Sequence, residues 1–379
     1  MTSITFGNNA TAGTLTSFTN NGANSAGQTA GLTSFTDTAS AASATIVNNG
    51  STIAGGSPAA TQFYDSSTAD QANITNNGSN ISGGFGAVTI FSGNATAANS
   101  VLTNNGGFGG GLGSSTMFVD NSTGALARGI ARGNGNIDIS GLTTTGMEIG
   151  SIEGNGNFFL GSKALTVGSN GLGTLVTGVI QDGGQAGGAG GSLVKEGVST
   201  TNLSAPNSYT GGTIIRAGTL LVSNIRGSGT GTGSVTVIRG VLGGTGTISG
   251  LVTVGPGMGQ GAVLAPGNQG VGTLTLTKML TFSTNSFLRY EVQLDTAQAD
   301  QVNAAGVTID AGAMFVFNSI RTGTLTTGTV FTVINNTSSS AIVGRFGNLR
   351  DNGVFRSGAT KFRASYEGGD GNDLTITVL

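Results

Sequence analysis

The sequence contains no His, no Cys and no Trp, and only 8% of its 379 residues are charged. Without His or Cys, the Ser–His–Asp and Cys–His catalytic arrangements cannot be built. Zinc and copper likewise lose their usual nitrogen and sulfur ligands. The lack of Cys also excludes a disulfide framework. We therefore expect no cofactor and no transition-metal site.

Charge of either sign is scarce, with 15 basic against 17 acidic side chains and a net charge of −2. Such a chain lacks the basic surface that attracts nucleic acid or an anionic membrane, so neither is an expected partner. No apolar run approaches the roughly 18 residues of a membrane-spanning helix, because Thr, Ser, Asn or Gly interrupts each one. The composition therefore argues against a protein that binds nucleic acid or an anionic membrane surface through positive charge.

Glycine is abundant, at 70 residues, and 37% of the chain is hydrophobic. The hydrophobic residues fall in short alternating runs rich in Val, Ile, Leu and Thr. Alternation of this kind is typical of half-buried strands and would serve no purpose in a disordered chain. The sequence therefore predicts an all-β protein.

A 28-residue repeat occupies the start of the chain. The triplet Asn-Asn-Gly recurs in constant register at residues 20–22, 48–50, 76–78 and 104–106. Phe35, Phe63 and Phe91 keep the same step, and Phe118 falls one residue short of it. A unit of this length with short strands and glycine-rich turns fits one coil of a β-solenoid. Propeller blades need longer units, and helical repeats need long segments of 3.6-residue period, which are missing here.

Stacking of such coils explains the choice of residues. Equivalent Asn side chains would pair amide to amide along the axis, about 4.8 Å apart, and each Phe would fill a wide layer of the interior. We also expect Asn and Gly to supply the left-handed backbone of sharp corners. The residues assigned this structural role are Asn20, Asn21, Asn48, Asn49, Asn76, Asn77, Asn104, Asn105, Phe35, Phe63 and Phe91.

The rhythm changes along the chain, and we predict four regions. Residues 1–125 form the 28-residue coils, and 126–190 form irregular solenoid coils. Residues 183–191 (GGQAGGAGG) have the composition of a flexible junction. Residues 191–255 carry a distinct repeat, and 256–379 form further coils and a cap. The apolar segments that begin at Arg289, Met314 and Val330 are candidates for covering the edge strands of the solenoid.

The most specific stretch runs from Gly191 to Asn224 and resembles the autotransporter-associated β-strand repeat of Gram-negative surface proteins. It departs from the family pattern at residues 199–202 and at Ala205-Pro206. Residues that match the pattern are Lys195, Gly197, Leu203, Asn207, Tyr209, Thr210, Gly211, Gly212, Thr213, Ala217, Gly218, Thr219, Leu220 and Val222. Of these, Tyr209, Gly211 and Gly212 are predicted to be structural.

This resemblance implies a right-handed parallel β-helix, namely the passenger domain of a type V secretion system. Passengers of this kind normally precede a membrane β-barrel, which we expect to be missing from this sequence. The implied location is extracellular or at the surface of a Gram-negative cell, with membrane contact only through the missing barrel. The resemblance favours a non-catalytic adhesin or stalk that binds a host-cell, matrix or glycan ligand, or copies of itself.

Two alternatives remain open. Asp37 and Asp65 occupy the same slot in neighbouring repeats, so that their carboxylates would lie near the roughly 5 Å separation of a retaining glycosidase pair. A polysaccharide hydrolase or lyase could use such a pair, although an Asp after an aromatic residue is more often a turn former. The chain could instead be a filament-forming solenoid or a spacer.

A possible calcium site lies near the C-terminus. Residues 368–373 (GGDGND) match the first six positions of the calcium-binding nonapeptide repeat, which makes Asp370 and Asp373 candidate ligands. Calcium in such repeats is shared between consecutive turns, and this sequence holds one copy. A tight turn into the last strand is the competing interpretation.

Overall fold

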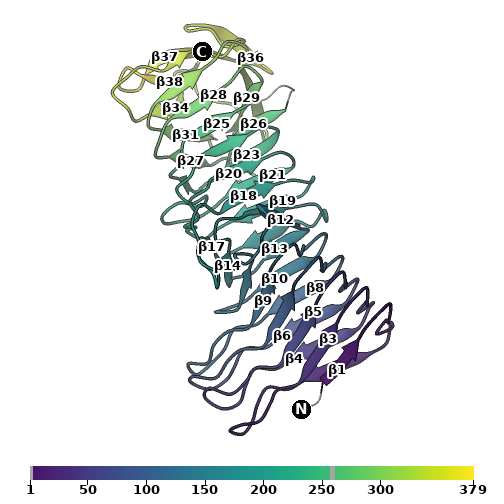
Figure 1. Ribbon diagram of the computed structural model, residues 1–379. Helices are drawn as coiled ribbons and strands as arrows, with labels where there is room; N and C mark the ends of the chain where they lie inside the picture. Colours follow the sequence, from purple (N-terminus) through teal and green to yellow (C-terminus); the bar gives the residue numbers. More distant parts are fainter. Residues whose placement is uncertain (1–2, 257–260) are drawn as a thin grey trace. The chain divides into compact units, whose positions relative to one another are not determined.

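The structure is a computed structural model that describes residues 3–256 and 261–379. Every regular element in these residues is a β-strand, and most strands pair in parallel with the equivalent strand one coil away. The chain divides into two compact units. Unit 1 comprises residues 1–199 and 208–211, and unit 2 comprises 200–207 and 212–379. Within each unit the strands stack as the rungs of a β-solenoid, which confirms the predicted fold class (Figure 1).

Two long parallel sheets dominate unit 1. The first contains β1 (Ser3–Phe6), β3 (Leu32–Phe35), β5 (Ala60–Phe63), β7 (Val88–Phe91), β9 (Ser115–Phe118), β11 (Asn136–Asp138), β14 (Asn157–Phe159) and β17 (Val179–Gln181). The second contains β2 (Ser17–Asn20), β4 (Thr45–Asn48), β6 (Asn73–Asn76), β8 (Val101–Asn104), β10 (Arg128–Ala131) and β13 (Ser151–Glu153). The unit also holds β12 (Gly146–Ile149), β15 (Ala164–Val167), β16 (Thr174–Val176) and β18 (Ser192–Lys195).

The strand register reproduces the sequence repeat. Ala60 pairs with Val88, which preserves the step of the triplets, and Val88 pairs with Ser115, one residue short of that step. The next pair, Ser115 with Asn136, is closer in the sequence, so the coils shorten where the Asn-Asn-Gly triplets end. The interior of the larger coils is wide enough for a stack of phenylalanine rings. Phe6, Phe35, Phe63, Phe91 and Phe118 lie 4.7–4.9 Å apart between centroids, within 9° of parallel.

The glycine-rich segment 183–191 is an anchored loop of unit 1. Asp138 Oδ2 accepts a hydrogen bond from the backbone N–H of Gln185 at 2.6 Å. The carboxylate of Asp182 accepts from the N–H groups of Gly190 and Gly191 at 3.2 and 2.9 Å. Composition alone predicted a flexible junction here, because it does not reveal the carboxylates that hold the backbone.

Unit 2 continues the same architecture with shorter coils. One sheet contains β20 (Thr213–Ile215), β22 (Val235–Val237), β25 (Val252–Val254), β28 (Leu280–Phe282), β32 (Val307–Ile309) and β35 (Val343–Gly344). A second contains β19 (Thr200–Leu203), β21 (Thr219–Val222), β23 (Gly240–Gly244), β26 (Ala262–Pro266) and β29 (Ser286–Gln293), with β30 (Gln298–Ala299) and β33 (Met314–Ile320) beside β29. A third contains β24 (Thr247–Ile248), β27 (Thr273–Leu276), β31 (Gln301–Ala304), β34 (Val330–Asn336), β38 (Asp373–Val378), β37 (Thr360–Gly368) and β36 (Val354–Ser357).

Antiparallel strands cap the C-terminal end of unit 2. β34 is parallel to β31 on one side and antiparallel to β38 on the other, and β36, β37 and β38 form antiparallel pairs. An aromatic cluster packs at this end, with ring centroids 4.8–5.3 Å apart. It consists of Phe317 from β33, Phe355 from β36 and Phe362 from β37. Of the three segments expected to form the cap, β29 and β33 pair in parallel with each other, although the end of β29 also pairs antiparallel with β30. The third, β34, is the first of the three to pair antiparallel with a strand of the cap.

Candidate functional site

The first Asn of each triplet forms a buried amide ladder inside unit 1. These residues end the strands of the second sheet, and each Nδ2 donates to the Oδ1 of the next Asn, at 2.7, 2.8 and 2.9 Å. A Thr hydroxyl from the first sheet donates to each Oδ1 at 2.9–3.1 Å. The ladder ends at Asn104, because Ala131 occupies the next register position. The members of this inner ladder are Asn20, Asn48, Asn76 and Asn104.

The second Asn of each triplet forms an outer ladder of opposite polarity. Asn49, Asn77 and Asn105 each donate from Nδ2 to the Oδ1 of the Asn one coil earlier, at 2.8, 2.8 and 2.9 Å, so that the ladder begins at Asn21. Asn21 is exposed and the other three are half-buried. The side chains of this row therefore lie at the surface.

The glycine of the triplet is required by close approach of the coils. A Cβ on Gly50 would lie 2.7 Å from the backbone nitrogen of Ser79, and one on Gly22 would lie 2.5 Å from the carbonyl oxygen of Gly50. All residues of the four triplets lie in the described part of the chain, and none has a positive φ. The expectation that the triplets supply left-handed corners is therefore wrong. Left-handed residues occupy other slots, such as Asp37 with a φ of 57° and Ala98 with 49°.

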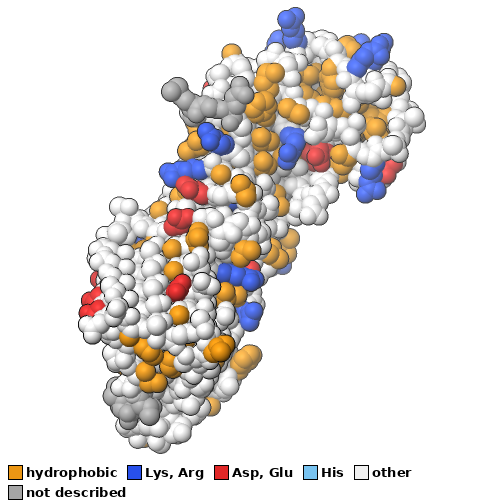
Figure 2. All heavy atoms as spheres, turned by 90° about the vertical axis from the view of Figure 1, so that its right-hand side faces the viewer, with side chains coloured by type: hydrophobic (Ala, Val, Ile, Leu, Met, Phe, Trp, Pro, Cys, Tyr) orange, Lys and Arg blue, Asp and Glu red, His pale blue; other side chains and the backbone are white. Residues whose placement is uncertain are grey.

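The outer ladder borders a polar groove of about 710 Å³. Asn104 ends β8 and is in register with Ala131, which ends β10. The residues that follow these strands, Asn105 and Arg132, are therefore neighbours in the surface row. Phe108, at 73% exposure, also lines the groove. On the face of the molecule drawn in Figure 2, charged side chains are few and scattered. The row bordering the groove is Asn21, Asn49, Asn77, Asn105, Arg132 and Asn155.

The groove presents a regular array of hydrogen-bonding groups. A carboxamide has two N–H donors and two lone pairs, and the ladder uses one of each at Asn49 and Asn77. Each amide thus keeps a donor and an acceptor for a ligand, and the groups repeat about every 4.8 Å along the row. An exposed aromatic ring next to polar amides suits a sugar, whose hydroxyls hydrogen-bond while its C–H face packs on the ring.

Asp37 and Asp65 are brought into neighbouring coils, where their carboxylates bind backbone. Asp37 Oδ2 accepts from the N–H of Asn8 at 2.7 Å, and Asp65 Oδ2 accepts from the N–H of Asp37 at 3.0 Å. Asp120 repeats the arrangement: a hydrogen bond from the Ser92 hydroxyl, followed by one from the Gly93 N–H, lowers its pKa. The left-handed φ of Asp37 and Asp65, 57° and 56°, explains why Gly93 can fill the same slot.

The residues that match the pattern of the autotransporter-associated β-strand repeat are engaged in structural contacts. Tyr209 is fully buried, and a Cβ on Gly211 would lie 2.1 Å from the carbonyl oxygen of Gly190. Gly212 has a φ of 96°, which favours glycine. Lys195 is fully buried, and its Nζ donates to the carbonyls of Glu196 and Gly197. Burial lowers the pKa of Lys195 to about 8, although the Glu196 carboxylate opposes this shift.

Asp370 lies in the turn between β37 and β38, and Asp373 is the first residue of β38. Asp373 is 6% exposed, and its Oδ1 accepts from the backbone N–H of Asn336 at 2.8 Å. Burial raises the pKa of Asp373, the Asn336 hydrogen bond opposes the rise, and the Asp370 charge adds to it. Within residues 3–256 and 261–379, no three acidic side chains gather as a metal-binding group. Asp373 thus joins the start of β38 to the end of β34.

The sequence did not identify Phe108 and Arg132 as groove residues. It shows Asp295 and Asp300 as a close acidic pair, but it did not predict that Asp300 is buried. Register could have found Arg132, because it follows Ala131 as Asn105 follows Asn104. Asp300 is 1% exposed, and burial raises its pKa to about 7, an effect that hydrogen bonds from two backbone N–H groups partly offset. Nothing in the spacing of the acidic residues signals this burial.

Comparison with known proteins identifies one repeat. Residues 193–222 match the family described as the passenger-associated-transport-repeat. None of the curated proteins matches the sequence. The part of the chain that the structure describes contains no helix with the length and hydropathy of a membrane span. With this repeat set in a parallel β-solenoid, the chain fits an autotransporter passenger domain, as the resemblance in residues 191–224 implied.

Proposed function

We propose that this chain acts outside a Gram-negative cell, secreted or on the cell surface, as a non-catalytic adhesive passenger. The passenger repeat at residues 193–222 supports export to that location. The amide groove of unit 1 supports adhesion, because it offers many weak polar contacts in a row. Asp37 and Asp65 support the non-catalytic assignment, since their carboxylates accept backbone hydrogen bonds.

The ligand proposed for this groove is an extended, neutral, β-linked polysaccharide. Its pyranose units repeat at nearly the spacing of the stacked coils, so that successive sugars would meet successive outer-ladder amides. The observation that carries the proposal is the surface row from Asn21 to Asn105, with Phe108 exposed beside it. Sugar hydroxyls would exchange hydrogen bonds with the amides, and one ring would pack on Phe108.

Calorimetric titration with cellohexaose and chitohexaose tests this proposal. Asn77→Ala and Phe108→Ala should each weaken binding about 5-fold or more, the loss expected for a hydrogen bond or a sugar-stacking contact. Asn94→Ala and Phe85→Ala are matched controls, because both side chains are exposed on unit 1 and neither borders the groove. The coiled α-linked maltohexaose should bind more weakly than the extended oligomers.

Lack of binding to either β-linked oligomer at millimolar concentration would contradict the proposed ligand, as would equal losses in groove and control variants. The hydrolase alternative is tested on the same oligomers. It requires release of new reducing ends that disappears in Asp37→Asn and Asp65→Asn, whereas the proposal expects no release by any of these proteins.

A further inference from the structure

A second groove, of about 700 Å³, crosses the outward face of the sheet in unit 2. Its floor is apolar and includes Leu221, Val241 and Pro266. In the register of the sheet, Leu221 lies beside Gly243, and Gly243 lies beside Ala265. A Cβ on Gly243 would come within 2.5 Å of the Ala265 carbonyl oxygen. Gly243 and Ala265 therefore leave a depression in the outward face of the sheet, beside the larger side chains of Leu221, Val241 and Pro266.

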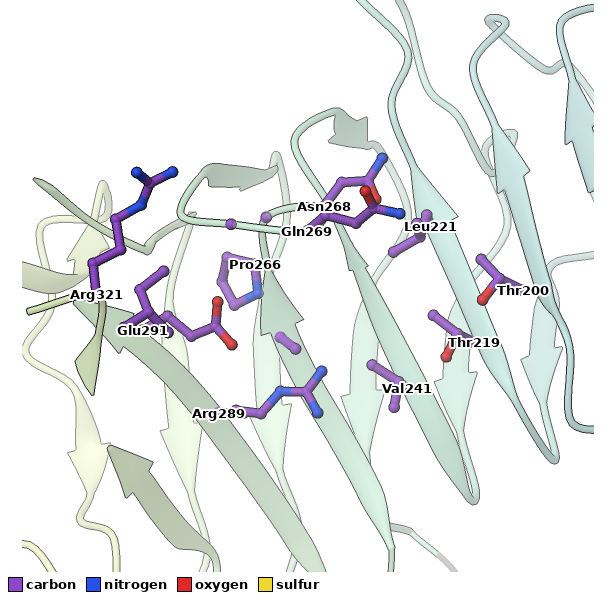
Figure 3. A pocket seen from close by; sticks show the side chains of 14 residues that line it. Thr200, Thr219, Leu221, Val241, Pro266, Asn268, Gln269, Arg289, Glu291 and Arg321 are labelled. Carbon is purple, nitrogen blue, oxygen red and sulfur yellow. The ribbon is translucent and has the colours of Figure 1, made fainter. Parts of the chain in front are cut away.

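Polar side chains line opposite sides of this groove. Arg289 and Glu291 alternate with buried residues along β29 and so face outward. In Figure 3, Arg289 extends across the floor towards Val241, while Asn268 and Gln269 lie on the loop across the groove, with their amides directed towards Leu221. A ligand in the groove would have donors on both sides and aliphatic groups beneath it.

Asp300 hydrogen-bonds to both sides of the groove, the loop on one side and β29 on the other. Its Oδ1 accepts from the N–H of Gly272, which follows the loop, at 2.9 Å, and its Oδ2 accepts from the N–H of Glu291 on β29, also at 2.9 Å. The loop is further fixed where Gly244 and Gly267 exchange two backbone hydrogen bonds of 2.9 Å. The groove is therefore held open by the fold, with Asp300 as a positioning residue.

Arg289 has unused binding capacity. Its Nε is buried and out of a ligand's reach, so that a ligand would meet the two terminal Nη groups. Among the described residues the guanidinium forms no ion pair. Arg321, at the end of β33, differs because it lies 3.7 Å from the Asp295 carboxylate. A guanidinium with free N–H groups binds carboxylate or sulfate through paired, charge-assisted hydrogen bonds.

We infer that this groove binds an acidic saccharide, with a carboxylate or sulfate on Arg289 and a sugar face on Leu221, Val241 and Pro266. The sugar hydroxyls donate to Glu291 and exchange hydrogen bonds with Asn268 and Gln269. This site lies in unit 2, uses a charge rather than an amide ladder, and is independent of the neutral-glycan groove of unit 1. The passenger would thus carry two saccharide sites of different charge preference.

Titration of the full chain with a galacturonic acid hexamer and a heparin hexasaccharide tests the inference and separates carboxylate from sulfate. Arg289→Gln should weaken binding of the preferred oligomer about 10-fold or more, the loss of a charge-assisted pair. Arg289→Lys keeps the positive charge but loses the paired N–H donors of the guanidinium, so its affinity should lie between those of the wild type and Arg289→Gln. Arg226→Gln is the matched control, because it removes one exposed positive charge from unit 2 and lines neither groove.

Binding of at least one acidic oligomer, lost in Arg289→Gln and kept in Arg226→Gln, would support the site. No binding of either acidic oligomer by the wild type would overturn it, as would equal losses in the two variants. Circular dichroism shows whether Arg289→Gln folds, and Arg289→Lys supplies the comparison if it does not. Cellohexaose binding reports on unit 1 alone, so failure of one proposal leaves the other measurable.

Discussion

Glycine serves two different purposes in these coils. At Gly50 the backbone of the next coil leaves no space for a side chain, whereas at Gly93 the backbone is left-handed. Asp can replace glycine at the left-handed position, because its carboxylate accepts a hydrogen bond from a backbone N–H of the preceding coil. Substitutions at the two kinds of position should therefore behave differently.

Gly50→Ala should destabilise unit 1 by about 2–3 kcal/mol, because its Cβ would force neighbouring coils apart. The control is Gly7→Ala, whose Cβ would meet its nearest atom at 3.4 Å without a left-handed φ. Urea unfolding followed by far-UV circular dichroism gives both values. Equal stability of the two variants would show that the coils are not in such close contact.

Ala98→Gly should stabilise unit 1 by about 0.5–1 kcal/mol, because Ala98 has a φ of 49°, a left-handed conformation that strains alanine and suits glycine. Ala26→Gly, at an exposed turn position without a positive φ, should lower stability by a similar amount through chain entropy. The same urea measurement decides, and a loss of stability in Ala98→Gly would contradict the strain argument.

Asp300 should make the stability of unit 2 dependent on pH. Burial raises its pKa to about 7 in the folded protein, against about 4 when unfolded, so the folded state binds the proton more tightly. This contribution is fully present below about pH 4, falls as pH rises, and is lost above about pH 7. Between pH 5 and pH 8 the wild type should lose about 2–3 kcal/mol more than Asp300→Asn. A wild-type loss no larger than that of the variant would refute the shift.

At the scale of the element, the two amide ladders separate stability from binding. Adjacent residues at the end of one strand point in opposite directions: Asn76 into the core and Asn77 to the groove. The inner amides also join the two sheets, since Thr89 donates to Asn76 at 2.9 Å. A repeated Asn-Asn pair therefore combines a structural residue with a surface one.

Asn76→Ala should destabilise unit 1 by about 2–4 kcal/mol, because it deprives the buried groups of Asn48, Thr89 and Asn104 of their partner. Asn77→Ala should cost no more than about 1 kcal/mol, since water can replace the lost bonds of a half-buried amide. Urea unfolding of the two variants makes the comparison. A reversed order would contradict the assignment of inner and outer ladders.

The periodic part of the sequence predicted the coils well, because a single repeating unit determines strands, stacking and interior at once. It did not predict which Asn is buried and which is at the surface, because the triplet Asn-Asn-Gly is the same whichever of its two Asn side chains faces inward. The groove of unit 2 was beyond prediction for another reason. Leu221, Gln269 and Arg289 come from different coils without a shared motif, and only the register of the sheet brings them together.

At the scale of the whole molecule, the chain combines little charge with many stacked amides, and it is on this ground that we propose saccharides as its ligands. One groove offers a row of neutral amides, and the other offers a free guanidinium over an aliphatic floor. On this proposal the solenoid offers two separate contact surfaces for saccharides. Weak contacts in such rows gain strength when several sugars of one chain are bound together.

The most direct test of this account is a nitrogen-15 NMR titration of the side-chain amides with cellohexaose. The account predicts that the resonances of Asn49, Asn77 and Asn105 shift, while those of Asn48, Asn76 and Asn104 stay in place. The inner set serves as an internal control, because it is buried in the same coils. Unchanged outer amides at saturating cellohexaose, or equal shifts in both sets, would contradict binding along the outer ladder.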